Sequence, residues 1–170
     1  ADRKGVTFEL REGARWHDGR PITAEDVVFS FNALRANGRP FFRSYWADVT
    51  EVVAEDPRRV TYRFRTDENR ELPLILGEMS VLPKHYWEAR DFTRPSLDLP
   101  LGSAAYRIER FDPNRSVVLR RVPDYWGRDL PTMRGMSNFD TIRYAVDKLE
   151  LLVDDESWPL VKYREMLFIR

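Results

Sequence analysis

Alternation of apolar and polar residues marks the first predicted strand, at residues 6–11. Val6, Phe8 and Leu10 are apolar, and polar residues stand between them, which is typical of a strand with one buried face. Four further segments share this pattern and form two predicted hairpins, each around an Asp-Pro turn: residues 49–54 with 60–65, and residues 106–111 with 116–122. Residues 139–146 are a further strand candidate.

A helical period replaces the alternation at residues 24–36, where apolar residues recur every three or four positions. Thr23 is the predicted N-cap, because its hydroxyl can accept the amide of Asp26 and acidic residues favour the first turn. Asn37-Gly38 predicts a left-handed end to this helix. Strands interspersed with a few helices indicate an α+β fold.

Proline positions divide the rest of the chain. Pro73 lies in the first turn of a short predicted helix at residues 71–78, and a second short helix is expected from Pro83. Residues 91–100 carry two prolines and no hydrophobic period, so they are the predicted linker.

Four aromatic residues gather within six positions directly after the predicted helix end: Phe41, Phe42, Tyr45 and Trp46. One interpretation is a loop that covers the core. The other is an aromatic wall of a ligand-binding cleft, where such side chains combine apolar area with polar groups.

Charge and composition exclude several classes of protein. The 28 Lys and Arg residues balance 28 Asp and Glu residues, both signs are mixed along the chain, and the net charge is zero. Nucleic-acid binders usually carry a net basic face, so we expect no nucleic-acid partner. The absence of cysteine excludes disulfides and thiol chemistry, and no apolar stretch approaches the ~20 residues of a membrane span.

Catalytic motifs are absent from the sequence. His17 and His85 are the only histidines, and Asp18 beside His17 could form an acid–base or metal pair, but no metal-ligand spacing, nucleophile elbow or phosphate loop accompanies them. We therefore predict no enzyme, no catalytic residue, no metal and no cofactor. A small hydrolase that uses His17 or His85 stays open as an alternative.

Residues 16–30 read Trp-His-Asp-Gly-Arg-Pro-Ile-Thr-Ala-Glu-Asp-Val-Val-Phe-Ser. This run resembles the W-x-D-G-x-P-x-T-A-x-D-V-x-F-S signature of the family 5 solute-binding proteins of ABC importers, which take up oligopeptides, dipeptides and nickel. Later stretches resemble the same family, at residues 102–106, 121–126 and 139–142, and the wording of residues 121–131 is most similar to the branch that binds microcin C and related peptides. Ala104 and Ala105 replace the family's Gly and Pro, and residues 147–170 match nothing in the family.

The resemblance implies a partial domain of the three-lobed, type II periplasmic-binding-protein fold. Residues 1–100 would form most of the second, smaller lobe, residues 101–146 the return strands toward the first lobe, and residues 147–170 an unassigned tail. The implied function is non-covalent capture of a peptide or peptide-like molecule by lobe closure and delivery to an ABC permease in the membrane. The implied location is the periplasm, with a signal peptide not present in this chain.

Two groups of residues carry the site predictions. The signature is expected to be structural, with Trp16 as an anchor, Asp18-Gly19 as the turn, Pro21 fixing the helix entry, and Thr23 and Asp26 capping. The residues expected to contact ligand are Phe41, Phe42, Tyr45, Trp46, Ser103 and Tyr106. The open alternative is a fragment that binds no peptide and forms homo-oligomers through its apolar tail.

Overall fold

The computed structural model describes residues 3–91, 94, 96–113 and 115–130. The chain divides into two units, Ala1–Arg94 and Pro95–Arg170. This division falls inside the predicted linker at residues 91–100. The assignment of the two parts to lobes of a larger receptor stays a prediction, and the strand candidate at residues 139–146 and the tail lie outside the described residues.

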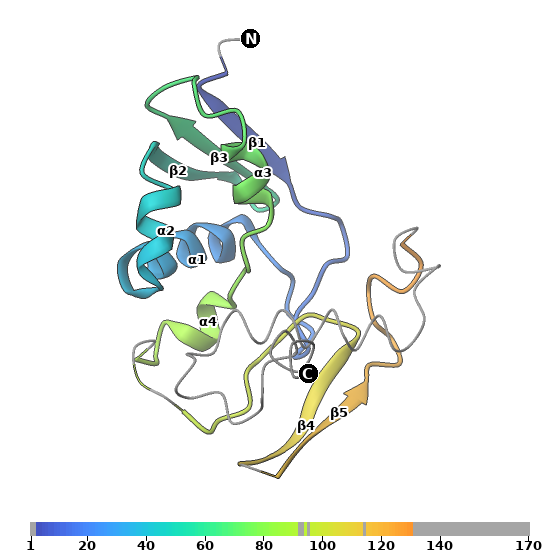
Figure 1. Ribbon diagram of the computed structural model, residues 1–170. Helices are drawn as coiled ribbons and strands as arrows, with labels where there is room; N and C mark the ends of the chain where they lie inside the picture. Colours follow the sequence, from blue (N-terminus) through green and yellow to red (C-terminus); the bar gives the residue numbers. More distant parts are fainter. Residues whose placement is uncertain (1–2, 92–93, 95, 114, 131–170) are drawn as a thin grey trace, which may run out of the picture. The chain divides into compact units, whose positions relative to one another are not determined.

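A three-stranded antiparallel sheet forms the centre of the first unit (Figure 1). Its strands lie in the order β1–β3–β2, with β1 at Gly5–Glu9, β2 at Val49–Asp56 and β3 at Arg59–Phe64. The predicted strand and hairpin are therefore confirmed. Along β3 the buried and exposed positions alternate, because Val60, Tyr62 and Phe64 point to the core.

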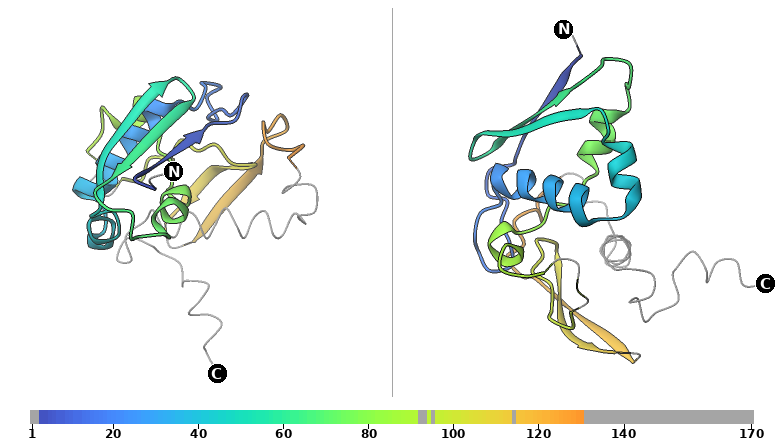
Figure 2. Two further views of the ribbon diagram at one scale, coloured as in Figure 1. Left: turned by 90° about the horizontal axis from the view of Figure 1, so that it is seen from above. Right: turned by 90° about the vertical axis from the view of Figure 1, so that its left-hand side faces the viewer.

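Helix α1 (Ala24–Asn37) lies along one face of this sheet, as both views in Figure 2 show. Its buried side chains include Val27, Phe31 and Leu34, at the spacing that the sequence predicted. The ring of Phe31 stacks on Trp46 with centroids 4.9 Å apart and meets Tyr62 edge-on at 5.6 Å. These three aromatic residues are the centre of the core of the first unit.

The predicted left-handed end of α1 is wrong. Gly38 has φ −78° and ψ −175°, an extended conformation that other residues adopt readily. A glycine is needed there for a different reason: a Cβ on Gly38 would collide with the Leu34 carbonyl oxygen and would lie 2.8 Å from the Phe42 ring. The Leu34 carbonyl at the end of α1 and the Phe42 ring of the next helix together leave room only for a glycine.

Three short helices complete the first unit: α2 (Pro40–Tyr45), α3 (Leu72–Gly77) and α4 (Lys84–Trp87). Helices α3 and α4 confirm the two short helices predicted from Pro73 and Pro83. Helix α2 replaces the loop expected around the aromatic residues, because Pro40 occupies its first position, where proline costs no hydrogen bond.

The second unit contains the predicted second hairpin, with β4 (Tyr106–Asp112) paired antiparallel to β5 (Ser116–Arg121). A register shift occurs between Ile108 and Arg110. After β5, the Trp126 indole donates a 3.0 Å hydrogen bond to the Ser103 carbonyl, which ties the chain before the hairpin to the chain after it. Nowhere in the described part of the chain is a helix long and apolar enough to cross a membrane.

Candidate functional site

Thr23 and Asp26 form a capping box at the start of α1. The Asp26 amide donates to the Thr23 hydroxyl at 3.4 Å, and the Thr23 amide donates back to Asp26 Oδ2 at 2.8 Å. The prediction that Thr23 is the N-cap is confirmed. The reciprocal bonds supply side-chain acceptors to two backbone donors at the start of the helix.

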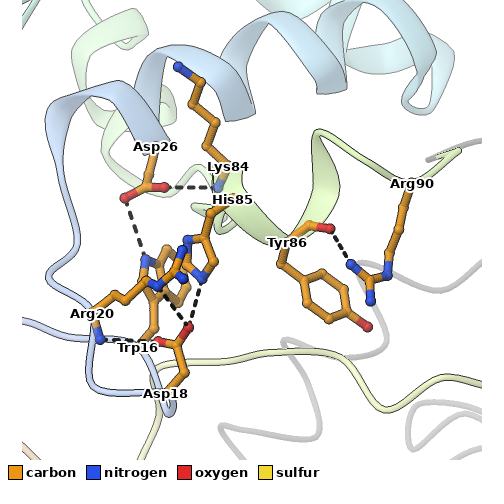
Figure 3. Close-up of polar contacts among 8 residues, drawn as sticks. All are labelled: Trp16, Asp18, Arg20, Asp26, Lys84, His85, Tyr86 and Arg90. Atoms are coloured by element: carbon orange, nitrogen blue, oxygen red, sulfur yellow. Dashed lines mark hydrogen bonds and ion pairs between the residues drawn. The ribbon is translucent and has the colours of Figure 1, made fainter.

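Asp26 also connects segments that are distant in the sequence (Figure 3). Its side chain is buried with the residue only 4% exposed. Oδ2 accepts the Trp16 indole N–H at 3.4 Å, and Oδ1 accepts the Lys84 amide at 2.8 Å. A buried carboxylate costs much free energy unless donors surround it, and here donors come from the turn, the helix start and α4.

The turn that precedes α1 holds Trp16 in place. Gly19 has φ +86°, a conformation that side chains with a Cβ rarely adopt, and its amide donates to the Trp16 carbonyl at 2.9 Å. Trp16 is 3% exposed, and Arg15 forms a β-bridge with Pro21 on the far side of the turn. The buried Trp16 and the positive φ of Gly19 support a structural role for the signature, and that role stays a prediction.

A second set of contacts joins the same region to residues 82–85. Ser30 Oγ accepts the Leu82 amide at 2.7 Å while donating to the Asp26 carbonyl at 2.6 Å. Lys84 Nζ lies 2.9 Å from Glu25 Oε2. This ion pair lowers the pKa of Glu25 and raises the pKa of Lys84, in each case through the hydrogen bond and then the opposite charge.

His85 is a partner of Asp18. His85 Nε2 lies 2.8 Å from Asp18 Oδ2, and both side chains are about one-third or less exposed. Partial burial acts to raise the pKa of Asp18, but the hydrogen bond from the Arg20 amide, the hydrogen bond to His85 and the charges of His85 and Arg20 together lower it. Within the described residues, no cluster of three or more His, Asp or Glu side chains could hold a metal ion.

At the end of α4, an arginine stacks on an aromatic ring (Figure 3). The Arg90 guanidinium carbon lies 3.8 Å from the centroid of the Tyr86 ring, and Arg90 Nη1 donates to the Tyr86 carbonyl at 2.6 Å. This contact holds Arg90, which lies a few residues beyond the end of α4, against the helix.

The four aromatic residues around α2 differ in burial, although the rings of Phe41 and Phe42 are in contact, with centroids 4.1 Å apart. Trp46 is 2% exposed and lies in the core, and the half-buried Phe42 packs on it at 4.7 Å between centroids. Phe41 and Tyr45 are 43% and 56% exposed and meet edge to face at 5.9 Å. The other two predicted ligand contacts, Ser103 and Tyr106, are half-buried in the second unit.

Sequence reasoning missed the contacts of Ser30, Glu25 and Asp26 with residues 82–85, and it missed the contact of Asp18 with His85. No local pattern could have revealed these contacts, because 52 to 67 positions separate the partners.

The fold is that of a periplasmic binding protein. The chain superposes with a TM-score of 0.63 on the periplasmic oligopeptide-binding protein of an oligopeptide ABC transporter from Thermotoga maritima, at 27% identity, over 74% of this chain and 24% of that one.

Sequence relatives agree with this fold. The chain is 41% identical over 151 residues to the protein named "Probable peptide-binding protein YejA" of Agrobacterium fabrum, covering 85% of this chain and 24% of the relative. It is equally similar to the uncharacterized protein y4wM of Sinorhizobium fredii, with 85% and 23% covered. The chain thus spans about a quarter of the length of these relatives.

The family model for bacterial extracellular solute-binding proteins, family 5, middle part, matches residues 1–148. The chain belongs to this family of solute-binding proteins.

Proposed function

We propose that this chain contributes one part of the solute-binding component of an ABC importer for peptides or peptide-like molecules. The bound molecule is captured without covalent chemistry when the lobes of the receptor close, and it is then passed to a permease in the membrane. The working location is outside the cytoplasmic membrane, as the name of the family states for its members. The observation that carries the proposal is the match over residues 1–148, together with 41% identity to a probable peptide-binding protein.

Within the chain, Phe41 and Tyr45 are the proposed ligand contacts in the first unit. Their rings are exposed, while Phe42 and Trp46 support them from the core. Exposed aromatic rings with a polar edge suit peptide side chains and backbone, because they bury large area at small entropic cost. Ser103 and Tyr106 are the proposed contacts from the second unit.

The test is an exchange of segments. Since the chain spans about a quarter of its relatives, residues 1–148 replace the matching segment of a relative that has first been shown to bind a pool of short peptides. We expect the folded chimera to be stabilised by the same pool, because a ligand at 100 times Kd adds ~2.7 kcal/mol to the free energy of unfolding. A chimera that folds but is not stabilised by any peptide would contradict the proposal.

Three measurements sharpen the test. Peptides recovered from the chimera should be chemically unchanged, and cleaved products would instead support a hydrolase. Substitution of Phe41 and Tyr45 by Ala in the chimera should raise Kd about 5- to 30-fold, the usual effect of losing a central aromatic contact. Leu74→Ala is the matched control, because Leu74 is 72% exposed on α3 and is not a proposed contact.

A further inference from the structure

The hairpin of β4 and β5 carries an excess of positive charge (Figure 1). Residues 106–121 contain five arginines and two acidic residues, although the whole chain has no net charge. Two of these arginines, Arg107 and Arg120, lie directly opposite each other in the register of the two strands. Like charges in this arrangement repel each other and lower the stability of a hairpin. The hairpin therefore contains a repulsion that its fold does not require.

An irregularity in β4 adds a third arginine to the same face. In a regular strand Arg107 and Arg110 would point to opposite sides, because side chains alternate. The register shift between Ile108 and Arg110 inserts Glu109 as an extra residue, so that Arg110 points to the side of Arg107. The burial pattern agrees, since Arg107, Glu109 and Arg110 are exposed, whereas Ile108 and Phe111 are half-buried.

The acidic residues of the hairpin neutralise only part of this charge. Glu109 Oε1 lies 2.7 Å from Arg120 Nη2. Asp112 is the last residue of β4, beside the turn. Among the residues that the structure describes, Arg107 and Arg110 form no ion pair. The middle of the face thus presents two guanidinium groups without an acidic partner and a third that shares its charge with Glu109.

The composition of this face indicates what it can contact. Interfaces between proteins usually have an apolar or aromatic centre. Here the half-buried Val118, opposite Arg110, supplies the apolar side chain, while Ile108 and Leu119 lie opposite each other on the other face of the hairpin. A partner that offers an extended array of negative charge suits this face better than a protein surface. Phosphodiester groups suit it in particular, because guanidinium groups donate two parallel hydrogen bonds to phosphate.

We propose that the exposed face of the β4–β5 hairpin binds reversibly to the phosphodiester headgroups of an anionic lipid surface through Arg107, Arg110 and Arg120. Each basic residue near such a surface contributes a small amount of binding free energy, so three of them give a weak and reversible attachment. Phosphates that lie between Arg107 and Arg120 also offset their repulsion. The inference concerns the second unit alone and does not depend on which molecule the protein captures.

Sedimentation of the whole chain with lipid vesicles tests this inference. We expect binding to phosphatidylcholine vesicles that contain about 30% phosphatidylglycerol, and none to vesicles of phosphatidylcholine alone. Binding should disappear as the salt concentration rises from about 0.05 to about 0.5 M, because salt screens exposed charges. No peptide is present, so the result is independent of the peptide binding measured with the chimera.

Variants identify the residues responsible. Arg107→Gln combined with Arg110→Gln should lower the partition coefficient about 25-fold, which corresponds to about fivefold for each residue. The matched control combines Arg11→Gln with Arg70→Gln, two exposed positions outside the hairpin, and changes the net charge by the same amount. It should lower the coefficient less than about twofold. Glu109→Gln should raise the coefficient about fivefold, because it releases Arg120 from its ion pair.

Any of three results would overturn the inference: no binding of the wild-type chain to the anionic vesicles, an equal loss of binding in the control variant, or release of the protein by millimolar inorganic phosphate at constant ionic strength. The last result would show that the face takes a single free phosphate group and not a lipid surface. If the double variant does not fold, Arg110→Gln and Glu109→Gln alone still test the inference, since their expected effects have opposite signs.

Discussion

Asp26 Oδ1 accepts a 2.8 Å hydrogen bond from the backbone amide of Lys84, which lies 58 positions further along the chain. The other oxygen of the same carboxylate accepts the Thr23 amide and the Trp16 indole. One buried side chain thus caps a helix, anchors the turn before it and attaches α4. This explains why an aspartate, and not the glutamate more common in a capping box, suits this position: the short side chain keeps both oxygens inside the cluster.

Asp26→Asn should lower the free energy of unfolding by about 2–3 kcal/mol, because the amide nitrogen would face a donor and leave a buried group unsatisfied. Urea denaturation followed by tryptophan fluorescence measures the change. The control is Asp56→Asn, where the exposed carboxylate accepts the Arg58 amide at 2.8 Å and lies 3.9 Å from the Arg59 guanidinium, and where asparagine is well tolerated in turns. Equal decreases in the free energy of unfolding for the two variants would show that Asp26 does not stabilise the contacts between these segments.

Thr23→Ala should cost roughly 1 kcal/mol of stability, the usual value for loss of an N-cap side chain. The substitution removes the side-chain acceptor of the Asp26 amide, but this amide still donates to the Thr23 carbonyl at 3.0 Å, and the Thr23 amide still donates to Asp26 Oδ2. For this reason the loss should be smaller than that of Asp26→Asn. Thr66→Ala, in a connecting segment, is the matched control. An unchanged urea midpoint for Thr23→Ala would contradict the capping role.

Local patterns predicted most elements of the first unit and the hairpin of the second. Alternation identified the strands, and the capping sequence identified the start of α1, because both depend on neighbours in the chain. The prediction for the end of α1 was wrong because Gly38 is extended and is selected by the lack of space beside the Leu34 carbonyl oxygen and the Phe42 ring, which the local sequence does not reveal. The aromatic run after it was taken for a loop although Pro40 starts a helix.

The same limit of prediction applies to the candidate site: patterns among neighbouring residues could be interpreted, and contacts between distant residues could not. The family signature could be recognised because it is continuous, and its capping role follows from its spacing. The partners of its carboxylates could not be predicted, since His85 and Lys84 reach Asp18 and Glu25 only after the chain has folded. The exposed pair of Phe41 and Tyr45 could likewise be separated from the buried Trp46 only by the structure.

Tyr62→Phe should leave the protein as stable or make it more stable, by up to about 1 kcal/mol, because it removes a hydroxyl that lacks a partner in the core. Tyr62 is 1% exposed, and in the described part of the chain its hydroxyl is the buried side-chain atom without a hydrogen bond. Burial raises the pKa of Tyr62, which shows how poorly this site would accept a charge. The control Tyr45→Phe, at an exposed ring, should leave the free energy of unfolding unchanged. A clear loss of stability in Tyr62→Phe would reveal a partner for the hydroxyl.

Lowering the pH should decrease the stability of the wild-type protein more steeply than the stability of the Asp18→Asn variant. The pKa of Asp18 is lower in the folded chain than its ordinary value of 3.8, so the folded state binds fewer protons than the unfolded state. The stability that Asp18 contributes is therefore present above about pH 4 and is lost as the pH falls through the lower pKa of the folded state. Urea midpoints at pH 2, 3, 4 and 5 measure the slope. Asp67→Asn, at an exposed position, should retain the wild-type slope, and parallel curves for Asp18→Asn and the wild type would count against the pair with His85.

Trp46→Ala and Phe41→Ala should differ strongly, although both residues belong to the same aromatic run. Trp46 stacks on Phe31 and on Phe42 with centroid distances of 4.9 and 4.7 Å and is 2% exposed. Its removal leaves a large cavity, which costs about 3–5 kcal/mol. Phe41 is 43% exposed, and its truncation should change stability by no more than about 0.5 kcal/mol. Urea denaturation of both variants checks the difference, and similar losses would mean that the run acts as one packed cluster, with no ring left to contact a ligand.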